Sequence, residues 1–172
     1  MAHGVRLAGL NMAARRTQRA LNFYRIARAI HPLFDGTGAG RFGTRWTSPG
    51  RKAIYAAGSY AGALMEVLAH AQRRDLKVAY HCLVIGIPAG VRIVELDPKD
   101  LPGWDSPDYT VSREFGDRWL NEAKTALVCV PSITGRPHER NYIIHPDHQD
   151  ASELQPAKPH SVIWDERLIT KR

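Results

Sequence analysis

A single carboxylate in an apolar stretch is the first candidate for chemistry in this chain. Residues 54–70 read IYAAGSYAGALMEVLAH, and Glu66 is the only acid among them, with His70 the only other group there that could carry charge near neutral pH. From Gly58 onward the spacing predicts a helix that is apolar on most of its circumference. Because an unpaired buried carboxylate is strongly destabilising, Glu66 should be paired or should border a polar cavity. It is therefore either a catalytic acid or one that reaches solvent or an arginine for structural reasons.

A basic set of candidates precedes Glu66. Arg25 lies in a predicted strand, Arg41 and Arg45 flank a glycine-rich turn, and Tyr55 ends a short strand. A guanidinium fork matches phosphate oxygens and glycine lets backbone N–H groups approach, so the set could bind a pyrophosphate, although each arginine taken alone fits a surface charge. The glycine-rich segment GTGAGRFG is not a P-loop, since no Gly-Lys-Ser/Thr follows. It also lacks the spacing and the following helix of a dinucleotide fingerprint.

Polar side chains in the second half of the chain follow apolar strands. Ser132 comes directly after Val130-Pro131, and Asn141 follows a little downstream. No nucleophile-elbow pattern surrounds Ser132, so it is either a positioning or binding hydroxyl or an ordinary turn serine. The histidines at 138, 145 and 148 lie in loop-like sequence without fixed helical spacing, so no metal site is predicted.

Composition limits the classes of protein and partner. The chain has 172 residues, a net charge of +7 and a pI of about 9.7, which favours anionic partners: nucleic acid, phosphorylated small molecules or an acidic protein. It contains no run of about 18 apolar residues, so no membrane span is expected. Arginines at 6, 15, 16 and 19 interrupt the N-terminus, which is unlike a secretory signal. Cys82 and Cys129 lie in apolar, strand-like runs, which favours buried free thiols in a cytoplasmic protein.

The elements that must position these groups are mostly strands. Residues 13–21 suit a short basic helix or an arm, and residues 31–44 suit a loop. Helices are predicted over 58–74 and 112–123, the second capped by Ser112. Since several strands follow one another directly, we expect an α+β fold with mixed, mostly antiparallel sheets and a few helices, not a doubly wound parallel sheet. The strands are predicted over residues 23–29, 52–57, 78–87, 91–96, 126–130, 141–144 and 161–169.

Taken in chain order, these residues resemble the RES domain, a family named for its Arg, Glu and Ser residues that provides the toxins of bacterial Xre–RES toxin–antitoxin pairs. No single segment is specific, but the ordered set from about residue 22 to 169 is. The segments are Tyr24-Arg25, Arg45-Trp46, Ile54-Tyr55-Ala56, Leu64-Met65-Glu66-Val67-Leu68, Val130-Pro131-Ser132 and Asn141-Tyr142. We expect an N-terminal basic arm or short helix over residues 1–21 and one RES-like catalytic domain over 22–172.

The resemblance implies a fold similar to diphtheria-type ADP-ribosyltransferases and NAD⁺ as substrate, with no metal. It implies cleavage of the nicotinamide–ribose bond and transfer of ADP-ribose to an acceptor. We prefer a protein as the acceptor. The alternative is phosphate or water, with depletion of NAD⁺. A cognate Xre-type antitoxin is the implied partner. The family's catalytic residues correspond to Glu66, Arg25 and Tyr55, and its NAD-binding residues to Arg25, Arg45, Tyr55, Ser132 and Asn141. Thr47 and His145 stand where the family commonly has Asn, which could alter the acceptor.

These residue types suit such a reaction. Cleavage passes through an oxocarbenium-like state that Glu66 could stabilise. Tyr55 could stack on nicotinamide, Arg25 and Arg45 could clamp the pyrophosphate, and Ser132 could bond the nicotinamide amide or the ribose. A basic nucleic-acid binder is the rival reading, but the arginines form no stripe interleaved with aromatics, so no direct nucleic-acid role is expected. A non-enzymatic interaction module is the second rival.

Overall fold

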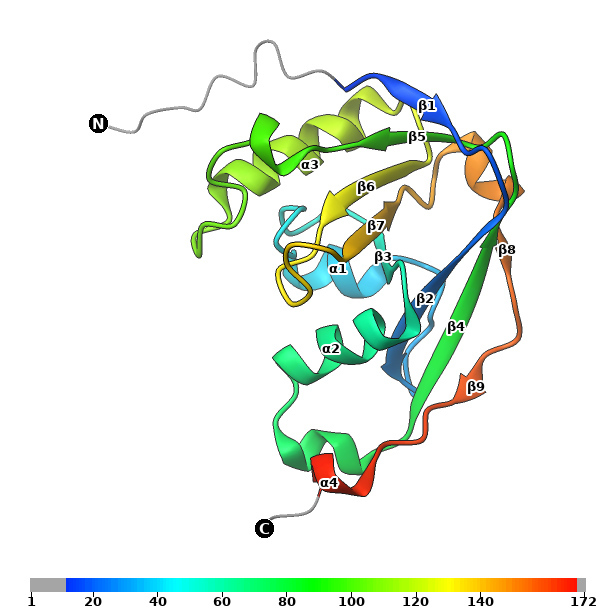
Figure 1. Ribbon diagram of the computed structural model, residues 1–172, viewed down its shortest axis with the longest axis vertical. Coiled ribbons are helices and arrows are strands. Elements are labelled where there is room, and N and C mark those ends of the chain that lie inside the picture. The colour runs from blue at the N-terminus through cyan, green and yellow to red at the C-terminus, as the bar shows by residue number, and fades with distance from the viewer. Residues whose placement is uncertain (1–11, 170–172) are drawn as a thin grey trace.

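One mixed, mostly antiparallel sheet runs through the molecule (Figure 1). The computed structural model describes residues 12–169, and within them nine strands take the order β1-β5-β6-β7-β3-β2-β4-β8, with β9 beside β4. Of the strand pairs in this range, β5 and β6 are parallel and the others antiparallel. The α+β prediction is confirmed. The strands are β1 (Ala14–Arg16), β2 (Leu21–Arg28), β3 (Ile54–Ala57), β4 (Tyr80–Ile87), β5 (Arg92–Glu95), β6 (Leu127–Pro131), β7 (Arg140–Ile144), β8 (Gln155–Pro156) and β9 (His160–Ser161).

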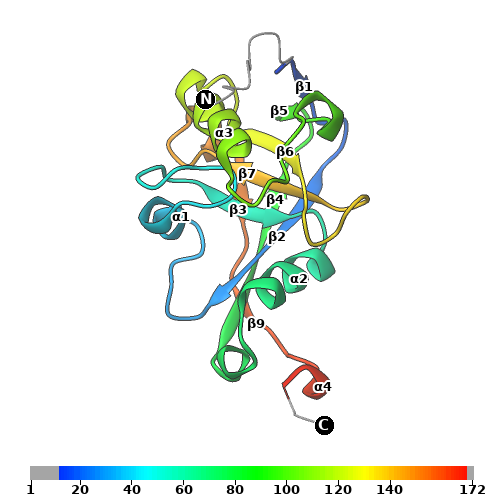
Figure 2. The same cartoon turned by 90° about the vertical axis from the view of Figure 1, so that its left-hand side faces the viewer.

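Helices lie on both sides of this sheet (Figure 2). Ser59 caps the helix that carries Glu66, because its side chain accepts a hydrogen bond from the Gly62 N–H at 2.9 Å. None of the helices over residues 12–169 is long and apolar enough to cross a membrane. The helices are α1 (Thr37–Phe42), α2 (Tyr60–His70), α3 (Thr110–Glu122) and α4 (Glu166–Ile169), with short 3₁₀ segments η1 (Arg73–Lys77), η2 (Pro98–Asp100) and η3 (Gln149–Glu153).

Two apolar clusters cover the two faces of the sheet. On one face, Phe115 and Trp119 of α3 pack with Val128 and Ile143. The other face carries a second cluster whose members include Phe23, Ile54, Leu83, Ile85, Leu127 and Ile144. Because both faces are covered, β6 is buried along its whole length. Cys82 and Cys129 are free and buried, as predicted.

The sheet is narrowest where β2 meets β3, a junction we call the seam. There the pairing is limited to Tyr24 opposite Ala57, whereas β2 pairs with β4 over its whole length. Strands on the two sides of the seam run in clearly different directions (Figure 2). The next residue, Arg25, reaches across the seam, and its Nη1 donates to the Tyr55 carbonyl at 3.0 Å. The seam therefore places two of the predicted site residues together.

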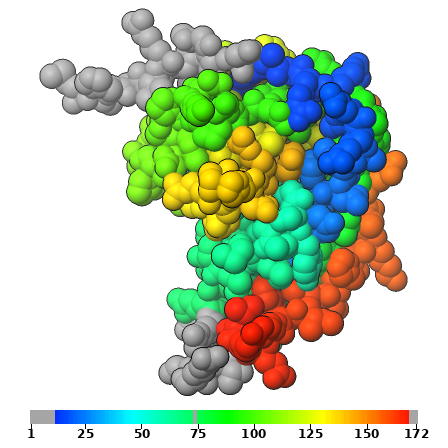
Figure 3. Space-filling model, viewed as in Figure 1, coloured from blue at the N-terminus to red at the C-terminus, as the bar shows by residue number. Residues whose placement is uncertain are grey.

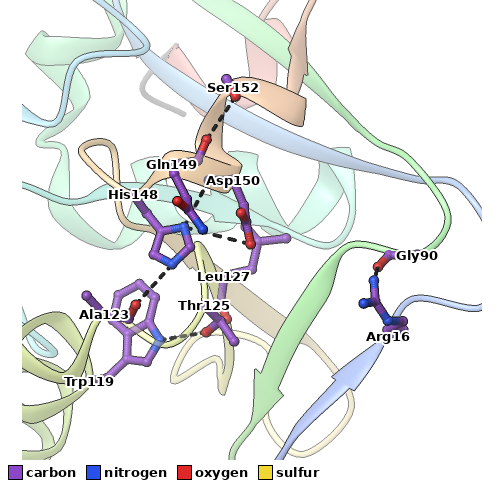
Figure 4. Close-up of polar contacts among 10 residues, drawn as sticks. All are labelled: Arg16, Gly90, Trp119, Ala123, Thr125, Leu127, His148, Gln149, Asp150 and Ser152. Atoms are coloured by element: carbon purple, nitrogen blue, oxygen red, sulfur yellow. Dashed lines mark hydrogen bonds and ion pairs between the residues drawn. The ribbon is translucent and has the colours of Figure 1, made fainter.

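The histidine-rich region closes the end of α3 (Figure 4). His148 Nδ1 accepts from the Asp150 N–H at 3.0 Å, so Nε2 carries the proton that it donates to the Ala123 carbonyl, also at 3.0 Å. Trp119 Nε1 donates to Thr125 Oγ1 at 3.0 Å on the same side of the helix end. These contacts satisfy polar groups at a helix terminus. Across the described residues no three His, Cys, Asp or Glu side chains come together in a metal-binding group.

Several predicted boundaries are wrong. The helix predicted to reach residue 74 ends at His70, because Ala71 turns to an extended conformation before η1. Residues 31–44 contain α1, whose six residues are too few to give a periodic pattern. Ser112 is not a cap, since α3 starts after Tyr109 and Ser112 is buried in its first turn.

The two ends of the chain also differ from expectation. Residues 14–16 form β1 and residue 21 begins β2, with a bend between them, so the described part of the basic stretch contains a strand where a helix or an arm was predicted; residues 1–11 lie outside the described range. The strand predicted over 161–169 is limited to β9. The last contact along it is Val162 N–H to the Tyr80 carbonyl, and β4 begins at Tyr80, so no partner strand remains for the residues beyond.

Candidate active site

Glu66 is held by three neutral donors on one carboxylate oxygen. Its Oε1 accepts from Ser132 Oγ at 2.9 Å, Thr134 Oγ1 at 2.8 Å and Asn141 Nδ2 at 2.7 Å. None of the described donor groups bonds the second oxygen, Oε2. We call Glu66, Ser132, Thr134 and Asn141 the carboxylate cluster. One oxygen is fixed and the other is available to a ligand.

The cluster forms because the β6–β7 connection folds back onto α2. Asn141 pairs opposite Val130 in the register of β6 and β7, so residues 132–139 form the loop that joins the two strands. At the far end of this loop, Glu139 Oε2 accepts from Ser59 Oγ at 3.0 Å, at the start of α2. In the space-filling view this loop (yellow to orange) rests directly against α2 (green-cyan) (Figure 3). The loop is therefore tied to α2 at both ends.

The surroundings of Glu66 differ from those predicted. Gly62 and Ala63 are the residues of α2 that are buried, whereas Met65 is 47% exposed. Glu66 itself is half-buried. The helix is therefore not buried around most of its surface, and three polar donors satisfy the carboxylate.

Tyr55 directs its hydroxyl into a turn formed by residues 44–48. The hydroxyl contacts Thr44 Oγ1 and lies 3.1 Å from Thr47 Oγ1. Thr44 Oγ1 in turn accepts from the Trp46 and Thr47 N–H groups, each at 3.1 Å. Burial raises the pKa of the Tyr55 hydroxyl well above its ordinary value, so it stays protonated. The hydroxyl is committed to the turn, and the ring is the part left to meet a ligand.

Arg45 lies in the same turn and anchors the loop before α3. Its Nη1 donates to the carbonyls of Trp104 and Ser106, at 3.3 and 3.0 Å. Its guanidinium stacks over the ring of Tyr109 at 4.4 Å from the centroid, and Arg113 lies at 5.2 Å from the same centroid. Arg45 is thus bound largely to its own protein.

The N-terminal part of helix α3 holds residues 44–48 in place. Ser112 Oγ donates to the Arg45 carbonyl at 2.6 Å, and the Ser48 N–H donates to Asp117 Oδ1 at 3.0 Å. Between them lies Gly116, where a Cβ would sit 1.7 Å from the Trp46 carbonyl oxygen. We call residues 44–48, seated on α3, the docked turn. Glycine is required at 116 because the two backbones approach too closely for any side chain.

Arg25 is the least satisfied of the predicted residues. One nitrogen bonds the Tyr55 carbonyl, but Nε is buried with no hydrogen-bond partner in the described structure. Burial lowers the pKa of the guanidinium below its ordinary value, and the charge of Asp35 opposes that shift. A buried donor without a partner is costly, so Nε is a candidate to meet a ligand acceptor.

The structure divides the predicted site residues into two groups. Glu66, Ser132 and Asn141 meet directly, and Thr134, which the sequence analysis missed, joins them. Arg25 and Tyr55 meet at the seam, and Arg45 follows Thr44 in the turn that holds the Tyr55 hydroxyl. The sheet links the groups: Tyr55 pairs with Ile143 and Ala57 with Asn141, so the side chains of Tyr55 and Asn141 project from the same face.

Comparison with known proteins gives the family. The model of the RES domain matches residues 22–165. The chain belongs to the RES-domain family. This confirms the resemblance seen in the ordered set of residues from Arg25 to Asn141.

Named relatives of this RES-domain chain are toxins. It is 34% identical over 158 residues to the Prs ADP-ribosylating toxin of Sphingobium sp. (strain YBL2), which covers 87% of this chain and 98% of that protein. It is 37% identical over 124 residues to Toxin Res of Pseudomonas putida, covering 70% of this chain and 83% of that protein. A chain in the crystal structure of the M. tuberculosis MbcT–MbcA toxin–antitoxin complex has the same fold, with a TM-score of 0.71 at 21% identity over 86% of each chain.

Proposed function

We propose that this RES-domain protein is a toxin that cleaves the nicotinamide–ribose bond of NAD⁺ and transfers ADP-ribose to an acceptor. The observation that carries the proposal is the carboxylate cluster, in which three donors fix one oxygen of Glu66 and leave the other open. The name of the Sphingobium relative, an ADP-ribosylating toxin, supports the same reaction class.

The open oxygen of Glu66 suits the chemistry of this bond. As the bond breaks, positive charge develops on the ribose, and a fixed carboxylate stabilises that charge more than it stabilises the neutral substrate. Oε2 accepts a hydrogen bond from a ribose hydroxyl and so orients the ring. Ser132 and Asn141 act on NAD⁺ indirectly, because they donate hydrogen bonds that hold Oε1 of Glu66 in place.

The basic residues supply the binding of the rest of NAD⁺. Arg25 offers its unpartnered Nε to the pyrophosphate, which would also satisfy that buried donor. Tyr55 contributes its ring to nicotinamide stacking, since its hydroxyl is already bonded to the turn. Arg45 adds positive charge at the same turn while holding the loop before α3.

For the acceptor we propose a protein side chain, with phosphate or water as the alternative in which NAD⁺ is depleted. A net charge of +7 favours docking of an acidic target surface. We further propose action in the cytoplasm, inhibition by a cognate Xre-type antitoxin, no metal requirement, and a catalytic domain spanning residues 22–172.

The test is incubation of the purified protein with labelled NAD⁺, with and without phosphate and cell extract. Label on a protein band supports transfer to protein. ADP-ribose 1″-phosphate or free ADP-ribose would instead identify phosphate or water as the acceptor. Inertness toward NAD⁺ under all conditions, combined with RNA or DNA binding that falls steeply with salt, would replace the proposal with the nucleic-acid reading.

A further inference from the structure

Two hydroxyl protons serve three contacts in the carboxylate cluster. Ser132 Oγ and Thr134 Oγ1 each lie within hydrogen-bond distance of Glu66 Oε1, at 2.9 and 2.8 Å, and lie 3.0 Å from each other. Each hydroxyl has one proton to donate. With Glu66 ionised, two of the three contacts can be hydrogen bonds at any moment. If one hydroxyl donates elsewhere, the other hydroxyl and Asn141 can still donate to Oε1.

The two hydroxyls differ in what they can reach. Ser132 is 3% exposed, and its Oγ also accepts from the Gly135 N–H at 3.1 Å, which fixes the serine in place. Thr134 is half-exposed and lies two residues further along the loop from 132 to 139. Thr134 is therefore the hydroxyl that a ligand beside Glu66 can meet, whereas Ser132 is enclosed.

Loop 132–139 is braced well enough to present Thr134 in one position. Glu139 ties its end to Ser59 of α2, and Arg136 forms an ion pair with Asp105 at 2.9 Å, toward the loop that Arg45 anchors. The ion pair is exposed and adds little energy, but it links two loops that flank the site. A donor on a braced loop can select between ligands.

We propose that Thr134 is a substrate-binding residue that reads the ribose diol, while Ser132 is a positioning residue for Glu66. This inference rests on the proposed function. A ribose presents two neighbouring hydroxyls, each able to donate and to accept. Glu66 Oε2 accepts from one of them, and Thr134 turns its proton from Oε1 to the oxygen of the other. Ser132 and Asn141 continue to hold Oε1, so the carboxylate does not move.

The test measures nicotinamide release by Thr134→Val, Thr134→Ser, Ser132→Ala and the control Ser152→Ala, which removes an exposed hydroxyl on η3. Each is assayed with NAD⁺ and with analogues that lack one hydroxyl of the nicotinamide ribose. For Thr134→Val we expect about a tenfold loss of kcat/KM on NAD⁺ and little further loss on the analogue that lacks the hydroxyl it binds. Thr134→Ser should restore activity. Ser132→Ala should lower kcat by the same factor on all substrates.

The outcomes separate this inference from the proposed function. If the wild-type protein releases no nicotinamide, the proposed function fails and the inference with it. If the wild type is active but Thr134→Val loses the same factor on NAD⁺ and on both analogues, Thr134 acts only on Glu66 and the inference is overturned. Wild-type activity in folded Thr134→Val, with melting temperature as the check on folding, also overturns it.

Discussion

The carboxylate cluster and the docked turn use similar polar side chains in opposite ways. In the cluster, side chains bond to one another around Glu66, and Oε2 has no donor among the described residues. In the docked turn, the contacts to α3 and the loop before it go to main-chain groups: Arg45 to the Trp104 and Ser106 carbonyls, and Ser112 to the Arg45 carbonyl. The side chains of Thr44, Thr47 and Tyr55 bond to one another within the turn. The carboxylate cluster therefore keeps an acceptor oxygen for a ligand, whereas the polar groups of the docked turn are already bonded to the protein.

This difference suggests different roles for the two regions, one in the reaction and one in the fold. A main-chain carbonyl cannot rotate away, so bonds to it fix a shape. A network of side chains can exchange partners when a ligand arrives. The cluster is thus the part of the molecule suited to react, and the docked turn is the part that keeps Tyr55 and Arg45 in place. Substitutions in the cluster should alter turnover in a stable protein, while substitutions in the docked turn should alter stability first.

The largest effect should come from the docked turn. Gly116→Ala places a Cβ 1.7 Å from the Trp46 carbonyl oxygen, so the turn and α3 must separate. We expect the free energy of unfolding to fall by about 3 kcal/mol, measured by urea denaturation. Gly38→Ala is the matched control: nothing lies within 4 Å of the added Cβ in α1, and a gain of up to about 1 kcal/mol is expected. Equal effects at both glycines would show that the docking is not tight.

Next is the carboxylate itself. Glu66→Ala removes the fixed charge, and we expect NAD⁺ cleavage to fall about 100-fold or more while the melting temperature changes little. Glu114→Ala, which removes an exposed acid from α3, is the control and should be neutral. A folded Glu66→Ala protein that cleaves NAD⁺ at the wild-type rate would remove the cluster from the chemistry.

The third prediction concerns Arg25, which reaches across the seam between β2 and β3. Arg25→Lys keeps the charge but loses the planar fork, so NAD⁺ binding should weaken by about tenfold, measured by calorimetry. Arg92→Lys, at an exposed position on β5, is the comparison and should leave affinity unchanged. Unchanged affinity in Arg25→Lys as well would assign Arg25 to the fold alone.

Tyr55→Phe separates the ring from the hydroxyl. The substitution removes the hydroxyl that contacts both Thr44 and the fully buried Thr47, so the free energy of unfolding should fall by about 1 kcal/mol. Because the ring remains, the loss of turnover in folded protein should be much smaller than that in Glu66→Ala. If Tyr55→Phe kept full stability but lost turnover, the Tyr55 hydroxyl would have a role in the reaction and not in the fold.

The smallest effect lies outside both regions, at His145 beneath α3. Burial and the neighbouring His148 lower the pKa of His145 below its ordinary value. The unfolded chain therefore binds a proton at higher pH than the folded one, so this contribution to stability is complete above about pH 6.5 and is lost as the pH falls below that value. His145→Asn should flatten the difference in unfolding free energy between pH 7.5 and 5.5. An unchanged difference would exclude His145 as its source.

The sequence predicted the parts of the site that come from regular elements. Glu66 stood out as the only acid in an apolar stretch, and the resemblance to the RES domain added Ser132 and Asn141 to it. Thr134 was not predicted, because a residue in a loop belongs to no periodic pattern in the sequence. Its one signal is its place two residues after Ser132. The chain reversal that brings the loop onto α2 depends on contacts such as Glu139 to Ser59, which are remote in sequence.

The role of the docked turn could not be predicted for a similar reason. Gly116 looked like an ordinary helix residue, and its close approach to Trp46 exists only after α3 packs on a turn almost 70 residues earlier, as the Ser48–Asp117 bond shows at a separation of 69. Thr47, one of the two departures noted in the sequence, lies with its Oγ1 3.1 Å from the Tyr55 hydroxyl. His145, the other departure, lies against Trp119 with ring centroids 6.0 Å apart.

The order of strands across the seam has a consequence for how the protein is made. The chain crosses from one side to the other repeatedly, since β2 and β4 lie on one side and β3, β5, β6 and β7 on the other. Neither side is a continuous stretch of sequence. Asn141 lies 75 residues after Glu66 and can reach it only when the whole segment between them has left the ribosome. A chain truncated before Asn141 therefore lacks the assembled site, and the proposed toxicity would arise only once that residue is in place.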